Sequence, residues 1–134
     1  MPDPALARSL LPLANRLADA AREAILPIFR TALACNPHNK DLTGFDPVTE
    51  GDRASERVMR EIIGSERPDD AIEGEEYGST PGKSGVTWYL DPIDGTRAFV
   101  AGLPSWCVLI GAVKDGKPII GIIDQPWLDE RYVG

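Results

Sequence analysis

Two carboxylates three positions apart, Asp91 and Asp94, are the residues whose spacing best suits chemistry. The apolar run 88–90 before them predicts a buried strand. Pro92 fixes its own φ and lacks an N–H, so we expect the strand to end there and the backbone to bend. The bend would aim both acids and the Ile93 carbonyl the same way. Because such hard oxygen ligands suit Mg²⁺ or Mn²⁺ rather than zinc, the hypothesis is a magnesium-binding phosphate site.

Gly95 and Thr96 directly follow these acids. Gly95 tolerates backbone conformations that other residues resist, and Thr96 can cap a helix that starts there. Free N–H groups at a helix start would receive phosphate oxygens. The Thr96 hydroxyl could orient an attacking water, and Asp52 could accept the proton that Thr96 passes on. Arg97 could meet an anionic substrate, but an exposed arginine at a helix start is an equally good interpretation.

Glu75 lies in the stretch 71–76, AIEGEE, which predicts a short strand that ends at Gly74. Two carboxylates about 4 Å apart repel by roughly 4 kcal/mol at an effective dielectric near 20, so Glu75, Asp91 and Asp94 could converge only with compensation. Two divalent cations roughly 3.5–4 Å apart could bind a phosphate, produce a hydroxide nucleophile and stabilise the departing alkoxide. Paired glutamates on a loop and a DPxDG run also occur as ordinary solvated turns, and spacing alone leaves that alternative open.

Two amphipathic helices are expected to support this site. From Leu6 to Phe29, apolar residues recur at three- and four-residue steps, and Pro12 and Pro27 are expected to kink or restart the helix. Its expected role is packing.

A second helix is expected to open within 46–56, DPVTEGDRASE, and to end at Gly64. Thr49 and Asp52 match a capping pattern. An acid in a first helical turn is stabilised by the helix dipole, so Asp52 also has a purely structural interpretation.

The remaining apolar runs predict a sheet. Residues 106–113 and 118–123 are β-branched stretches joined by a turn with the pair Asp115 and Gly116, a strong hairpin signal. Their continuous apolarity implies that both faces are covered, so helices should flank the sheet. A strand could begin at 131–133. The expected fold class is α+β, with two helices packed on a mainly antiparallel sheet.

Three other stretches predict irregular structure. Residues 35–45 read as a mobile loop, in which His38 is expected to have a surface role, and residues 77–86 read as a flexible connection compatible with a lid. Residues 97–101 predict a short helical turn.

The composition fits one globular domain: 134 residues, 43% hydrophobic and 26% charged. A net charge of −7 argues against nucleic acid as a partner. Cys35 and Cys107 have neither disulfide-framework nor zinc spacing, which favours reduced thiols. The start lacks the basic region of a signal peptide, so we expect a cytoplasmic protein with no membrane partner.

The stretch WYLDPIDGT at 88–96, with GEE at 74–76 and DPVTEGD at 46–52, resembles the inositol monophosphatase family of magnesium-dependent, lithium-sensitive phosphatases. The apolar strands as far as Tyr132 also fit, so the resemblance covers nearly the whole chain. It implies a layered αβαβα-type phosphatase fold, of which residues 1–134 would hold the N-terminal, metal- and phosphate-binding α/β part.

The resemblance implies a metal-ligand set. Glu75 would bind a first metal, Asp91 would be shared between metals, Ile93 would contribute its carbonyl, and Asp94 would serve a second metal. The implied cofactor is Mg²⁺, with Mn²⁺ as an alternative, in a two- or three-metal activation of water.

Thr96 and Asp52 match the family's water-activating pair, and the backbone of Gly95 and Thr96 matches its phosphate contacts. Within the family, residues 91–104 and 116–134 are most similar to the histidinol-phosphate phosphatase branch of histidine biosynthesis. Inositol monophosphatase proper is the close alternative, and the branch acting on adenosine bisphosphates is more distant.

Family chains are about twice as long, and their second half supplies a further metal-binding aspartate in a WD-containing motif and most substrate-recognition residues. No stretch here matches that motif. The expectation is therefore an N-terminal portion that is inactive alone or depends on association through exposed strands, with a homodimer as the expected assembly. A non-catalytic metal- or phosphate-binding module and a structural fragment stay open as alternatives.

Overall fold

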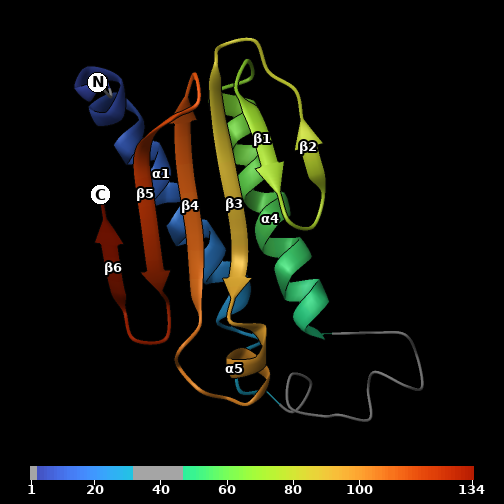
Figure 1. The fold of residues 1–134 in the computed structure, drawn as a ribbon. Helices are drawn as coiled ribbons and strands as arrows, with labels where there is room; N and C mark the ends of the chain where they lie inside the picture. The colour runs from blue at the N-terminus through green and yellow to red at the C-terminus, as the bar shows by residue number, and fades with distance from the viewer. Residues whose placement is uncertain (1–2, 32–46) are drawn as a thin grey trace.

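The computed structural model describes residues 3–31 and 47–134, with the side chains of the second range described from residue 50 onward. In these residues a six-stranded sheet carries two long helices on one face (Figure 1). The elements are α1 (Pro4–Ile25), α4 (Pro47–Glu66), β1 (Ala71–Gly74), β2 (Gly78–Thr80), β3 (Val86–Asp94), α5 (Thr96–Val100), β4 (Cys107–Lys114), β5 (Lys117–Gln125) and β6 (Glu130–Val133).

The sheet has the strand order β2-β1-β3-β4-β5-β6. Only β1 and β3 pair in parallel, and every other neighbouring pair is antiparallel, which confirms the mainly antiparallel α+β prediction. The β4–β5 hairpin turns at Asp115 and Gly116, whose φ values of 49° and 78° are both left-handed. This is the turn that an Asp-Gly pair favours.

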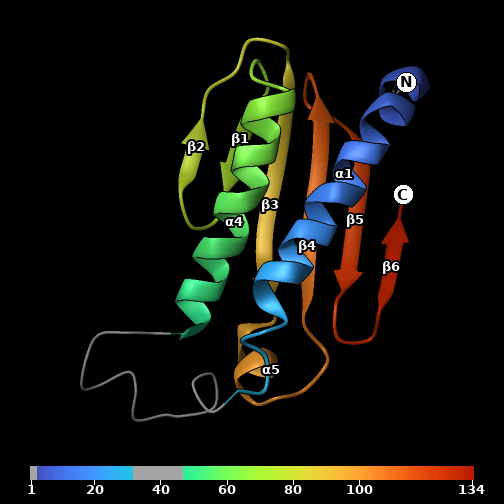
Figure 2. The same ribbon diagram turned by 180° about the vertical axis from the view of Figure 1, so that it is seen from behind.

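Helix α1 begins with Asp3, whose Oδ1 accepts hydrogen bonds from the N–H groups of Ala5 (3.0 Å) and Leu6 (3.1 Å). The helix runs through Pro12 and ends at Ile25, so Pro27 lies beyond it. Its buried stripe packs on the sheet beside α4, as the apolar periodicity predicts (Figure 2).

Helix α4 opens within 46–56, as predicted, but differs from the prediction in its cap and at its C-terminal end. It already includes Pro47, so Thr49 and Asp52 do not form a cap at its start, and it continues past Gly64 to Glu66. Proline suits a first helical turn because its missing N–H has no partner there. Gly64 is exposed and lies inside the last turn, where glycine weakens a helix without forcing it to stop.

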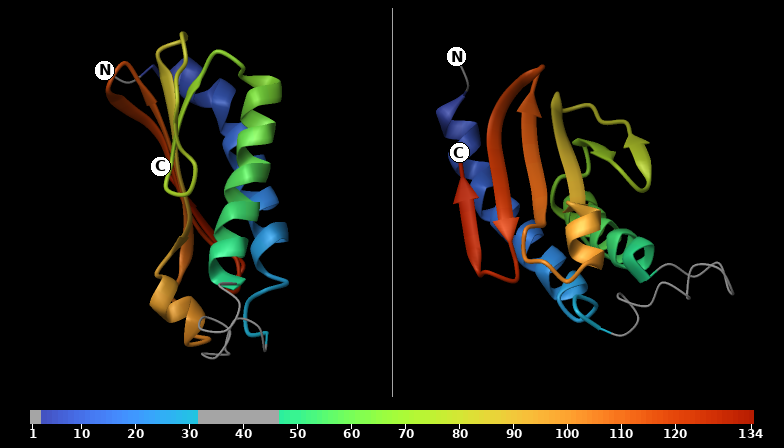
Figure 3. Two further views of the ribbon diagram at one scale, coloured as in Figure 1. Left: turned by 90° about the vertical axis from the view of Figure 1, so that its right-hand side faces the viewer. Right: turned by 60° about the horizontal axis from the view of Figure 1, so that its bottom comes forward.

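Within the described ranges, helices cover one face of the sheet only (Figure 3). The opposite face exposes Tyr89 by 49%, Ile123 by 48% and Tyr132 by 57%. The expectation that helices flank both faces is therefore not met by residues 3–31 and 47–134. The described helices include none that is long and apolar enough to cross a bilayer.

The stretch 77–86, predicted as a flexible connection, contains the short edge strand β2, in which Thr80 pairs with Ile72 of β1. The predicted loop 35–45, with His38 and Cys35, lies outside the described residues.

Candidate metal and phosphate site

The parallel pair β1 and β3 brings two predicted ligands to one edge of the sheet. Gly74 pairs with Leu90, so Glu75 and Asp91 are the next residue of each chain segment. The Glu75 N–H donates to the Leu90 carbonyl at 3.3 Å and continues the pairing. Parallel strands end at the same edge, and this is why acids 16 positions apart in sequence become neighbours.

The sequence predicts that the strand ends at Pro92, but β3 continues to Asp94. Asp91 pairs with Leu109 and Asp94 with Cys107, so β3 carries one residue more than β4 between these two pairs. The predicted bend is therefore a β-bulge, a place where a strand tolerates a proline that cannot donate to the ladder.

Asp91 has the electrostatics of a carboxylate held in an unfavourable place. Its Oδ1 is buried and has no hydrogen-bond donor among the described residues. Burial, then the adjacent Glu75 carboxyl and the charge of Asp94, raise the pKa of Asp91 from 3.8 to about 7. Desolvation and like charges both oppose ionisation, and a cation would reverse both effects.

Cys107 is the closest described thiol to these acids, with Sγ 3.8 Å from Asp94 Oδ2. Burial, then the charges of Asp94 and Asp91, raise the pKa of the Cys107 thiol to about 11. A thiol that stays protonated is a poor nucleophile, so the site does not favour cysteine chemistry.

The residues after the acids form α5, a helix of five residues. Gly95 is its N-cap, with a left-handed φ of 90° that favours glycine, so the prediction that Thr96 caps this helix is wrong. Thr96 is its first residue, and its hydroxyl donates to the Ile93 carbonyl at 3.4 Å. The buried Phe99 anchors α5, with its ring 4.9 Å from that of Trp106.

Asp52 lies on the buried face of α4, with 8% of its surface exposed. The neighbouring Gly51 faces Ile93, and a Cβ on Gly51 would come within 3.9 Å of Ile93 Cδ1. This turn of α4 therefore packs against the end of β3. The water-activating pairing of Asp52 with Thr96 stays a prediction, and Arg97 is exposed.

Among the described side chains, no three acids, cysteines or histidines form a ready-made metal cage. Like charges keep carboxylates apart, and both Glu75 and Asp94 are exposed. The donor types nevertheless fit Mg²⁺ or Mn²⁺, since carboxylate and carbonyl oxygens predominate and Asp91 Oδ1 is a buried oxygen available to accept. The ligand set stays a prediction that the chemistry of Asp91 favours.

A groove of about 840 Å³ runs over the open face of the sheet, and Glu75 and Asp91 line it. Apolar side chains, including Tyr89, Ile123 and Tyr132, make up much of the remaining lining. The two acids therefore face a space large enough for a small ligand.

Glu56 is a buried acid near this site that the sequence reasoning missed. It hydrogen-bonds to the backbone directly after Glu75. The signal for it was periodic: Asp52 and Glu56 share a helical face with Met59 and Ile63, the face that the apolar pattern assigns to the core. Two acids on a core-facing stripe need a reason to be there.

Comparison with known proteins gives a consistent result. The sequence profile described as the inositol monophosphatase family matches residues 7–134. A histidinol-phosphatase of Mycobacterium tuberculosis is 41% identical over 122 residues, which are 91% of this chain and 46% of that protein. An inositol-1-monophosphatase of Mycolicibacterium smegmatis, ImpA, is 34% identical over 130 residues, which are 97% of this chain and 45% of that protein.

Among solved structures, an inositol monophosphatase from Zymomonas mobilis superposes with a TM-score of 0.81 at 45% identity, covering 95% of this chain and 47% of the other. The chain therefore spans about half the length of the relatives that it matches, and the likeness extends over nearly all of its own length.

Proposed function

The chain belongs to the inositol monophosphatase family, and on that premise we propose that the protein is a metal-dependent phosphomonoesterase. Its substrate would be a small polyol or amino-alcohol phosphate, with histidinol phosphate as the first candidate. The 134 residues would form the N-terminal, metal- and phosphate-binding part of the catalytic unit.

The state of Asp91 is the observation that best supports this proposal. A half-buried carboxylate with one buried oxygen that lacks a donor, a raised pKa and a second acid beside it costs stability unless a cation binds. Acids in this state concentrate at functional sites. Glu75, Asp91 and Asp94 with the Ile93 carbonyl would hold Mg²⁺ or Mn²⁺.

The metal would supply a Lewis acid for the phosphate and lower the pKa of the attacking water. Thr96 would orient that water, and the proton of the water would pass through the Thr96 hydroxyl to Asp52. The water oxygen forms a bond to phosphorus while the bond from phosphorus to the alcohol oxygen breaks, and the departing alkoxide takes a proton from solvent. The Gly95 and Thr96 N–H groups would receive the phosphate oxygens.

The match to the histidinol-phosphatase of Mycobacterium tuberculosis supports histidinol phosphate, because its 41% identity exceeds the 34% identity of the Mycolicibacterium smegmatis inositol phosphatase. The 45% identity with the Zymomonas mobilis inositol monophosphatase supports inositol phosphate as the second candidate. The intact set of Asp52, Glu75, Asp91, Asp94 and Thr96 favours an enzyme over a non-catalytic binding module.

The test uses the full gene product and measures phosphate release from histidinol phosphate and from inositol 1-phosphate. We expect release that requires Mg²⁺, stops on chelation, is inhibited by lithium and favours histidinol phosphate in kcat/KM by about tenfold or more. The reverse preference would establish the second candidate. No release from a wider panel of phosphomonoesters with Mg²⁺ would refute the phosphatase proposal.

Assembly and location belong to the same proposal. We expect a homodimer, measured by light scattering of the full gene product, and no affinity for nucleic acid or membranes. The cytoplasmic location stays a prediction.

A further inference from the structure

We propose that Glu56 is a positioning residue that fixes the turn after β1 and so aims Glu75 toward Asp91. The inference rests on the proposed metal-dependent function. It concerns a carboxylate that lies outside the predicted ligand set and contacts the chain directly after one of its members.

Glu56 is fully buried, and its carboxylate spans two consecutive backbone donors. Oε1 accepts the N–H of Glu76 at 2.9 Å, and Oε2 accepts the N–H of Tyr77 at 2.9 Å. Both amides lie immediately after Glu75. A carboxylate that accepts two adjacent amides restrains the peptide planes between them, and these planes set the direction of the Glu75 side chain.

Arg60 completes the arrangement from one turn further along α4. Its Nε donates to Glu56 Oε2 at 2.9 Å, and its Nη1 donates to Thr80 Oγ1 at 2.9 Å. Another contact joins Arg60 to the Gly78 carbonyl. With Arg60 and two amides as donors, the buried charge of Glu56 is compensated inside the protein, so Glu56 has no need of a cation.

Gly74 is the residue that lets Glu56 reach the turn. A Cβ on Gly74 would lie 2.4 Å from the Glu56 Cδ and Oε2 atoms. No side chain fits at that distance, so any residue other than glycine would push the carboxylate away from its two amides. A glycine at position 74 is therefore required sterically for Glu56 to bind the turn after β1.

Helix α4 thereby supports both halves of the proposed chemistry. Asp52 and Glu56 are four residues apart and lie on the same buried face. One rigid helix would carry the proposed proton acceptor and would also hold the segment that carries Glu75. Supporting groups of this kind change metal affinity by about 10–100-fold when they are removed from known metal sites.

The test uses the full gene product and titrates Mn²⁺ by calorimetry and electron paramagnetic resonance. Glu56→Gln keeps the shape but replaces one acceptor oxygen by an amide that cannot accept an N–H. We expect its Mn²⁺ affinity to fall by about tenfold or more, with kcat recovering as Mg²⁺ is raised to saturation.

Asp70→Asn is the matched control. Asp70 is also a buried acid that an arginine compensates, and it lies in the connection between α4 and β1. It accepts hydrogen bonds from Arg67 at 2.8 Å and from Trp88 Nε1 at 2.9 Å. It precedes β1, whereas Glu75 follows it. Both variants should lose stability, and only Glu56→Gln should lose Mn²⁺ affinity.

Gly74→Ala is the second variant, because it displaces the Glu56 carboxylate without altering its charge. It should weaken Mn²⁺ binding in the same direction, which covers the case in which Glu56→Gln fails to fold. Wild-type affinity in a folded Glu56→Gln or Gly74→Ala protein would overturn the positioning role. A wild-type protein that binds no Mn²⁺ would instead overturn the proposed function and, with it, this inference.

Discussion

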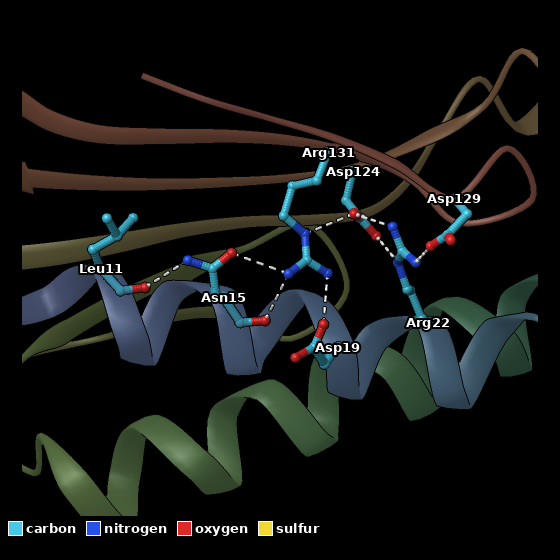
Figure 4. A network of polar contacts seen from close by, with 7 residues as sticks. All are labelled: Leu11, Asn15, Asp19, Arg22, Asp124, Asp129 and Arg131. Carbon is cyan, nitrogen blue, oxygen red and sulfur yellow. Dashed lines mark hydrogen bonds and ion pairs between the residues drawn. The ribbon is translucent and has the colours of Figure 1, made fainter.

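Asp91 on β3 is half-buried, with its Oδ1 removed from water, and Asp124 on β5 is fully buried, but the surroundings of the two acids differ. Asp124 is fully buried and accepts three hydrogen bonds from two arginines: from Arg22 at 2.7 and 2.8 Å, and from Arg131 at 2.8 Å (Figure 4). Asp91 has a buried oxygen with no donor among the described residues and two acids nearby.

The Asp124 cluster joins three elements. Arg131 of β6 also donates to Asn15 Oδ1 at 3.0 Å and to Asp19 Oδ1 at 2.7 Å on α1 (Figure 4). The hydrogen bonds to Asp124 outweigh burial and raise the pKa of Arg22 above its ordinary value. This cluster attaches the β5–β6 hairpin to α1, and the buried carboxylate of Asp124 is satisfied by donors from within the chain.

The difference distinguishes Asp124, an acid that the fold satisfies, from Asp91, the proposed metal ligand. A buried carboxylate that the fold itself satisfies stabilises that fold, whereas one that the fold leaves unsatisfied raises the question of an external partner. Burial and the neighbouring acids Glu75 and Asp94 raise the pKa of Asp91, and a compensating cation would have to come from outside the chain.

The largest expected effect is that of Asp91→Asn on catalysis. If Asp91 is the ligand shared between metals, its loss should cost several kcal/mol of transition-state stabilisation, or about 10²–10³-fold in kcat/KM. Mn²⁺ affinity, measured by calorimetry on the full gene product, should fall with it. Wild-type Mn²⁺ affinity in Asp91→Asn would remove Asp91 from the ligand set.

Asp124→Asn should give the opposite pattern. Removing the negative charge between Arg22 and Arg131 takes away the buried acceptor that both arginines share and leaves each with only an exposed carboxylate partner, which should cost about 3 kcal/mol in the free energy of unfolding. Denaturant melts would measure that loss, and Mn²⁺ affinity should not change. The stability of metal-free Asp91→Asn is the comparison, and it should fall less than that of Asp124→Asn because Asp91 Oδ1 has no hydrogen-bond donor to lose. A larger loss of stability for Asp91→Asn than for Asp124→Asn would contradict the distinction.

Asp52→Asn should separate proton transfer from metal binding. If Asp52 accepts the proton through Thr96, kcat should fall by about 10²-fold while Mn²⁺ affinity stays at the wild-type value. Steady-state kinetics at saturating Mg²⁺ would measure the first quantity and calorimetry the second. Equal losses of metal affinity in Asp52→Asn and Asp91→Asn would show that Asp52 is not confined to proton transfer.

Local patterns predicted the elements that carry apolar periodicity or a specific turn. Helix α1 and the β4–β5 hairpin follow from such signals. Strand β2 has no such pattern, since all three of its residues are exposed at the edge of the sheet. The continuation of β3 beyond Pro92 depends on a bulge against β4, which local rules for proline do not anticipate.

The candidate site shows the same limit. Its residue types were found from DPIDGT and GEE, but the contact of Glu75 with Asp91 depends on the parallel register of β1 and β3. Arg22 and Asp124 are 102 positions apart, and no local pattern pairs them. Glu56 lies on the core-facing stripe of α4, but its role could not be predicted because its two amide partners belong to a turn after β1 and carry no side-chain signal.

Asp70 offers the smallest test and the one with a defined pH dependence. Burial alone would raise its pKa, but hydrogen bonds from Arg67, Ser84 and Trp88 outweigh burial and lower the pKa of Asp70 below 3.8. A lowered pKa in the folded state adds stability above the unfolded value of 3.8, and this stability is lost as the pH falls through the folded value. The pKa of Asp91 is raised instead, so ionisation of Asp91 lowers the stability of the metal-free protein as the pH rises above 3.8.

Asp70→Asn should therefore cost about 1–2 kcal/mol at neutral pH, and its difference from wild type should shrink as the pH drops below 3.8. Urea melts of both proteins across that range would measure the difference. If the difference in unfolding free energy between the two proteins instead stayed constant with pH, the negative charge of Asp70 would contribute nothing to stability. Hydrogen bonding within the chain would then not suffice to mark a buried acid as structural, and the contrast between Asp124 and Asp91 would rest on the metal alone.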